Sequence, residues 1–88
     1  MINVSHHLLF MAFRYALGRW TFAPSIVAEE VGNNMTEIPT QILEMMADQI
    51  MSAWAVGGLG DECDVRTWTD LHDLIEAELE RRKHDQAR

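Results

Sequence analysis

The sequence is poor in the residues that cross-link, anchor or interrupt small folds. Its 88 residues include two prolines and a single cysteine, Cys63, which excludes a disulfide within the chain and favours a reducing, cytoplasmic setting. Its apolar runs are only a few residues long, far short of the ~20 that span a bilayer. The first residues carry no basic stretch ahead of an apolar one, so the sequence predicts no signal peptide.

Acidic and basic residues are unevenly distributed along the chain. The formal net charge is −7. Residues 29–65 contain eight acids and no lysine or arginine, whereas residues 1–28 contain two arginines and no acid. A segment of one sign sets up a negative field that repels nucleic acid and attracts basic protein surfaces. The same charge is equally consistent with a simple role in solubility.

The spacing of apolar residues predicts helices and no strand. Ser5 and Asp64 are suited to cap the starts of the first and last helices. Gly18 and the glycine-rich run 57–60 are expected to end the first and third helices. The sequence therefore predicts an all-α fold, with one domain over residues 1–88 that forms a compact bundle of about four helices. The predicted helices are His6–Leu17, Pro24–Val31, Pro39–Val56 and Val65–Lys83.

Each predicted helix carries an apolar face that the bundle would bury. The apolar stripe of the third helix ends with Trp54, and that of the fourth begins with Trp68, so both tryptophans are expected to be largely buried. Ile26 is expected on the apolar face of the second helix. The residues expected on the solvent-facing stripe around the third helix are Glu37, Gln41, Glu44, Asp48 and Ser52.

No pattern of catalytic or metal-binding residues stands out. Cys63 lies among carboxylates, which disfavour the thiolate that a nucleophile requires. The run 61–64 lacks the paired ligand spacing of a zinc site and the alternating oxygen ligands of a calcium loop. His6 and His7 are adjacent, and on a helix they point about 100° apart. The sequence therefore predicts no enzyme, no metal ion and no cofactor.

A helix-turn-helix motif is an alternative that the spacing of small and apolar residues suggests. Ala28, Gly32 and Ile38 fall at the small, turn and core positions of that motif. However, Pro39 would interrupt the recognition helix, and acids rather than bases would face the DNA phosphates. A small transcriptional regulator is therefore the second alternative, and direct binding of nucleic acid is not expected.

The segment with the most distinctive composition is residues 13–22, Phe-Arg-Tyr-Ala-Leu-Gly-Arg-Trp-Thr-Phe. Arginine, tyrosine and tryptophan are enriched at binding hot spots, so Arg14 and Arg19 are candidate anchors for a partner. In a second interpretation the segment is a structural corner, in which Trp20 and Phe22 pack on the core. The two arginines would then pair with the acidic middle of the chain.

Residues 14–19, Arg-Tyr-Ala-Leu-Gly-Arg, resemble a segment of small proteins encoded in phages and prophages. Thr21 and Phe22, the acid-rich run 61–64 and the Trp-x-x-Leu pattern of residues 68–71 extend the resemblance. Small, acidic phage proteins without enzymatic activity are often inhibitors of a host complex, and anti-CRISPR proteins belong to this class. The resemblance therefore implies an inhibitor of a bacterial defence complex that acts in the cytoplasm of an infected host.

The leading hypothesis is an anti-CRISPR-like inhibitor. It would dock its acidic middle on a basic, nucleic-acid-binding groove of a protein complex such as a CRISPR effector. The alternative is a self-associating helical adaptor or structural protein, because a homo-oligomer would hide surplus apolar surface. The residues expected to bind the partner are Glu29, Glu30, Glu37, Glu44, Asp48, Arg14 and Arg19.

Overall fold

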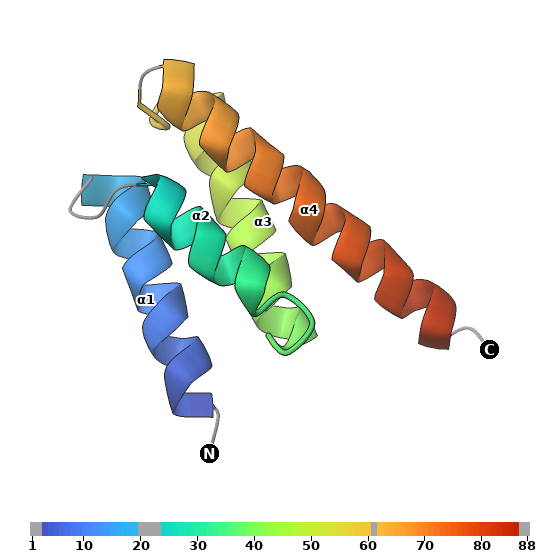
Figure 1. Ribbon diagram of the computed structural model, residues 1–88. Coiled ribbons are helices and arrows are strands. Elements are labelled where there is room, and N and C mark those ends of the chain that lie inside the picture. The colour runs from blue at the N-terminus through green and yellow to red at the C-terminus, as the bar shows by residue number, and fades with distance from the viewer. Residues whose placement is uncertain (1–2, 20–23, 61, 87–88) are drawn as a thin grey trace.

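The computed structural model describes residues 3–19, 24–60 and 62–86, and within these ranges the chain forms four helices and no strand. The predicted all-α bundle is confirmed. None of these four helices combines the length and the apolar character that crossing a membrane requires. The helices are α1 (Asn3–Arg19), α2 (Pro24–Asn33), α3 (Thr40–Ala55) and α4 (Glu62–Gln86) (Figure 1).

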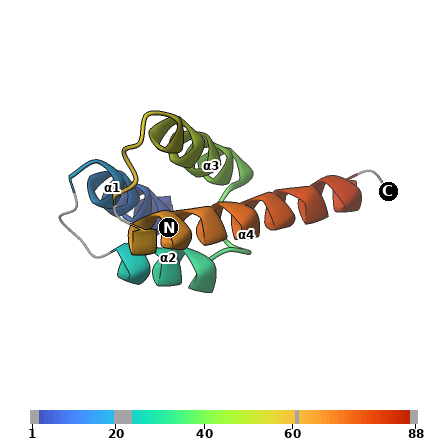
Figure 2. The ribbon, with the colours of Figure 1, turned by 90° about the horizontal axis from the view of Figure 1, so that it is seen from above.

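The longest helix, α4, organises the bundle. It packs against α2 on one side and against α3 on the other, and α1 packs against both α2 and α3 (Figure 2). The C-terminal turns of α4 project beyond the other three helices, which gives the molecule extents of 41 × 27 × 18 Å. Because α2 and α3 lie on different sides of α4, acids that are close in sequence are separated in space.

The core forms where the apolar faces of the four helices meet. Phe13 of α1 and Trp68 of α4 are fully buried, and their rings meet edge to face with centroids 5.4 Å apart. Burial of a side chain of this kind stabilises the fold by about 1.5–3 kcal/mol. The other buried apolar residues are Phe10, Ala16, Leu17, Val27, Val31, Ile38, Leu43, Met46, Ala47, Ile50, Leu59, Leu71 and Ile75.

The expected burial of Trp54 is wrong, because half of this side chain is exposed (50%). Trp54 lies in the last turn of α3, after which the chain reverses. The Gly58 N–H donates to the Ala53 carbonyl at 2.7 Å, and the Gly57 N–H donates to the Trp54 carbonyl at 3.0 Å. This is a Schellman turn, and the positive φ of Gly57 (72°) suits it. The turn buries Leu59 (1% exposed), which closes this end of the core in place of Trp54.

Several predicted helix ends differ from those in the structure, while α3 agrees within one residue at each end. Ser5, the predicted cap, and Gly18, the predicted end, both lie inside α1. A glycine within a helix lowers stability by only about 1 kcal/mol relative to alanine, so Gly18 does not end this helix. Asp64 lies within the first turn of α4, where carboxylates interact favourably with the helix dipole. At the other end of α4, an ion pair of 2.9 Å between Arg81 and Asp85 supports turns that sequence periodicity alone did not predict.

Candidate functional site

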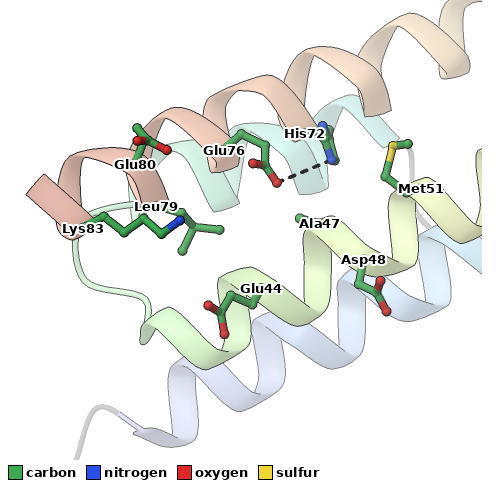
Figure 3. Close-up of a pocket in the computed structure, with 9 residues that line it drawn as sticks. All are labelled: Glu44, Ala47, Asp48, Met51, His72, Glu76, Leu79, Glu80 and Lys83. Atoms are coloured by element: carbon green, nitrogen blue, oxygen red, sulfur yellow. Dashed lines mark ion pairs between the residues drawn. The ribbon is translucent and has the colours of Figure 1, made fainter.

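A groove of about 360 Å³ runs between α3 and α4. Ala47 and Leu79 contribute apolar surface between the two helices (Figure 3). Ala47 is small, so it leaves open the space that a larger side chain would fill. The residues that line the groove are Glu44, Ala47, Asp48 and Met51 of α3, and His72, Glu76, Leu79, Glu80 and Lys83 of α4.

Four carboxylates stand on the walls of this groove, two from each helix. Glu44 and Asp48 are four residues apart on α3, and Glu76 and Glu80 are four residues apart on α4. Residues with this spacing share one face of a helix, so each helix presents a pair of acids to the groove. All four side chains are exposed. The walls are therefore predominantly negative.

Few positive charges balance these carboxylates. Nε2 of His72 lies 3.7 Å from Oε2 of Glu76 (Figure 3), and the histidine contributes charge only when it is protonated. Glu80 lies 3.7 Å from His84, which is exposed. Within the described residues, no ion pair joins Glu44 or Asp48 to a base.

Lys83 is the one lysine or arginine that lines the groove. In the part of the chain that the structure describes, it makes no ion pair with a carboxylate. At neutral pH the groove thus has four carboxylates against one ammonium group. Such a site attracts cationic groups and repels phosphates.

A different carboxylate of α4, Glu78, is neutralised within the protein. Its side chain is buried (8% exposed). Arg81 pairs with it at 2.7 Å and Arg82 at 2.8 Å. Hydrogen bonds from Arg81, which has the larger effect, and from Arg82 lower the pKa of Glu78 from 4.5 to about 2. Two of the three bases near the C-terminal end of α4 are therefore occupied by one buried acid.

Arg82 also ties α4 to the turn between α2 and α3. Its guanidinium group donates to the carbonyls of Met35 at 3.0 Å and Thr36 at 3.3 Å. It donates as well to Oγ1 of Thr40 at 2.9 Å. A planar group with several donors satisfies all these acceptors at once, which a lysine could not do. Arg82 therefore holds the far end of α4 against the start of α3.

The structure divides the five acids that the sequence predicts as one docking surface. Glu44 and Asp48 line the groove. Glu29 and Glu30 are exposed on α2, which lies across α4 from α3 (Figure 2). Glu37 is exposed in the turn between α2 and α3. Two of the five acids are thus brought together, and the other three do not line this groove.

The two predicted arginine anchors lie on α1. Arg14 is exposed, and no ion pair joins it to an acid within the described residues. Arg19 is the last residue of α1. Its side chain lies outside the described residues, as do Trp20, Phe22 and Asp61. Both interpretations of the segment 13–22, a partner anchor and a structural corner, therefore stay open.

Sequence reasoning missed the α4 wall of the groove, which consists of His72, Glu76, Glu80 and Lys83. Residues 66–88 contain six acids and five bases, so their summed charge is close to zero. The helical period sorts these charges onto different sides of α4, and a sum over the segment conceals this. The four-residue spacing of Glu76 and Glu80 was the signal that could have revealed the wall.

The groove has no features of a metal centre, and known proteins give no further guide. Across the described residues, no group of three or more His, Cys, Asp or Glu side chains could hold a metal ion. No protein-family model, curated protein or solved structure matches this chain. The charge and shape of the groove are therefore the basis on which a function is proposed.

Proposed function

We propose that this protein is a non-catalytic inhibitor that binds a basic surface of a bacterial protein complex. The α3–α4 groove is its main docking site. The observation that supports this proposal is that acidic residues of two helices line one groove, whose lining contains a single lysine. Channels that hold nucleic acid are lined by lysine and arginine, and a row of carboxylates competes for these side chains.

The energetics of the groove favour a role in binding over a role in folding. Like charges four residues apart destabilise a helix by about 0.2–0.5 kcal/mol per pair. Both α3 and α4 carry such a pair, Glu44 with Asp48 and Glu76 with Glu80. Charges that oppose folding and lie in a groove are suited to an external partner of opposite charge.

The more specific form of the proposal is anti-CRISPR activity in the cytoplasm of a phage-infected bacterium. The resemblance of residues 14–19 to phage proteins implies this setting. A defence effector that captures nucleic acid would lose access to it when the acidic groove covers the basic residues of its channel. The protein would then act by occupying a surface, without any chemical step.

Plaque formation in a bacterium with an active CRISPR system tests the proposal. Expression of the parent chain should restore plaques of a phage that the system targets. A groove variant should fail to do so, whereas a control variant with three exposed acids neutralised elsewhere should behave as the parent. The groove variant is Glu44→Gln/Asp48→Asn/Glu76→Gln/Glu80→Gln, and the control is Glu29→Gln/Glu30→Gln/Asp70→Asn.

Two results would contradict the proposal at different points. If the folded parent chain restores no plaques against any type of CRISPR system, the anti-CRISPR form is wrong. If the groove variant folds and inhibits as well as the parent, the groove is not the docking site. Arg14 and the exposed apolar side chains would then be the surfaces to test.

A self-associating adaptor is the second candidate function, because the structure exposes several large apolar side chains. Ile26 is among them, which corrects its expected place on the inner face of α2. Light scattering over a range of concentrations separates the two functions, since only an adaptor should grow into a higher oligomer. The exposed large apolar residues are Leu8, Met11, Ile26, Met45, Met51, Trp54, Val56 and Leu74.

A further inference from the structure

We infer that the partner segment that enters the α3–α4 groove is a basic amphipathic helix. Its apolar side chains would lie against Met51 and Trp54, and its lysines and arginines would lie over the carboxylates. This inference rests on the proposed function for the existence of a partner protein. It goes beyond that function by naming the chemistry and conformation of the segment that binds.

At one end of the groove an apolar side chain, Met51, lies near His72 (Figure 3), and the core does not require it. Met51 lines the groove and is 45% exposed. Trp54 lies outside the groove lining, but it is half exposed and follows three residues later, so the two side chains are neighbours on the surface of α3. Leu59 already closes the core at this end. Exposed methionine and tryptophan side chains are typical of grooves that receive an apolar anchor from a partner.

The rest of the groove carries the four carboxylates and Lys83. Asp48 lies nearest to Met51, whereas Glu44, Glu80 and Lys83 lie toward the opposite end, with Glu44 and Glu80 on opposite walls (Figure 3). A segment that complements this surface needs apolar residues at one end and cationic residues along the rest. A purely basic segment would leave Met51 and Trp54 uncovered, and a purely apolar one would bury unpaired carboxylates.

The dimensions and hydrogen bonding of the groove favour a helical partner. The α4 wall of the groove runs from His72 to Lys83, a span of eleven residues, which is about 16 Å at the helical rise of 1.5 Å per residue. About three turns of a partner helix cover that length. An extended peptide would need backbone partners, which the internally bonded helices α3 and α4 do not provide. A helix satisfies its own backbone groups and presents cations at the four-residue spacing of the acids.

Two other occupants fit the groove less well. Nucleic acid carries the same sign of charge as the carboxylates and is repelled. A second copy of this chain has a net charge of −7, and two of its bases, Arg81 and Arg82, are engaged with Glu78. A foreign segment rich in lysine or arginine is the occupant that complements the groove in charge.

An NMR titration with a synthetic peptide tests the inference on the intact chain. The probe is a peptide of about 14 residues with leucine on one helical face and lysine on the other. Saturable shifts of amide signals are expected in residues 44–54 and 72–83. A peptide in which serine replaces leucine, and one in which glutamate replaces lysine, should bind at least about tenfold more weakly.

Protein variants separate the contribution of Met51 and Trp54 to binding from the contribution of the α3 carboxylates. Met51→Ala/Trp54→Ala and Glu44→Gln/Asp48→Asn should each weaken binding of the leucine–lysine peptide by about tenfold or more. Leu74→Ala removes an exposed apolar side chain of α4 that neither lines the groove nor neighbours Met51 in the sequence of α3, and it should leave the affinity unchanged. The amide spectrum of each variant reports whether it is folded, so a folding defect is distinguished from a loss of binding.

Several outcomes would overturn the inference. These are an absence of saturable binding, shifts outside the two ranges, or equal affinity for the serine-containing peptide. Shifts of the groove signals that depend on protein concentration without peptide would show that a second copy is the occupant. The proposed inhibitor function and the proposed partner helix can fail separately. If the peptide binds as expected but no plaques are restored, only the inhibitor function is wrong. Restored plaques without peptide binding overturn only the named partner segment.

Discussion

The two sides of α4 treat carboxylates of the same type in opposite ways. Glu78 is buried and is paired with Arg81 and Arg82. Glu76 and Glu80, two residues away on either side, stand exposed on the groove. Successive residues of a helix point about 100° apart, so neighbours in sequence meet different surroundings. A carboxylate that two arginines neutralise inside the protein serves the fold, whereas an exposed carboxylate that meets only a histidine is available to a partner.

The largest expected effect compares two consecutive bases on these two sides of α4. Arg82→Ala should lower the free energy of unfolding by about 2–3 kcal/mol, because it removes charged hydrogen bonds to Glu78 and to the α2–α3 turn. Lys83→Ala removes the same charge from the groove and should change stability by only about 0.5 kcal/mol.

Urea unfolding followed by circular dichroism measures both values, with an unchanged slope as the sign that the unfolded states are alike. If Arg82→Ala and Lys83→Ala lower the free energy of unfolding equally, the Glu78 side and the groove side of α4 do not differ in their contribution to the fold. Arg82→Lys is a useful third variant. It keeps the charge but not the planar set of donors, so it should recover only part of the lost stability.

An intermediate effect should appear in acid. Folded Glu78 stays charged down to a pKa of about 2, whereas the unfolded chain takes up a proton near 4.5. The stability that this pair contributes is therefore fully present above about pH 4.5 and is lost as the pH falls toward 2. Glu78→Gln should lose less stability between about pH 5 and pH 3 than the parent does. Glu80→Gln is the matched control and should follow the parent.

The smallest expected effect is a gain in stability when the groove is neutralised. Replacing Glu44, Asp48, Glu76 and Glu80 by their amides removes two like-charge helix pairs. It should raise the free energy of unfolding by roughly 0.5–1 kcal/mol at low salt. Because the repulsion is screened, the gain should shrink as salt is added. A loss of more than about 1 kcal/mol would show that the fold depends on these four acids. The groove side of α4 would then not differ from the Glu78 side.

Much of the fold follows from local patterns in the sequence. The apolar period, Pro39 and the glycines after Val56 place α3 within one residue at each end. The same period cannot show where packing against other helices stops, so it placed Trp54 in the core. The burial of Leu59 depends on the Schellman turn, whose geometry is set by backbone hydrogen bonds beyond the end of the helix.

The candidate site was less predictable because it depends on contacts between distant parts of the chain. Glu44 and Asp48 were identified from the polar stripe around the third helix. The bonds of Arg82 to Met35 and Thr36 span more than forty residues, and no local pattern indicates them. A count of charge made from the sequence does not contain these bonds. In such a count the bases at the end of α4 cancel the acids of the same helix. The groove therefore became visible only in three dimensions.

The position of Arg82 beside Lys83 has a consequence for the entropy of binding. Arg82 fixes the last turns of α4 to the α2–α3 turn and to Thr40 at the start of α3. The groove cannot widen at this end unless those hydrogen bonds break. Its width is thus set before any partner arrives, and the two walls lose little conformational freedom on binding. Such preorganisation leaves more of the contact energy available as affinity.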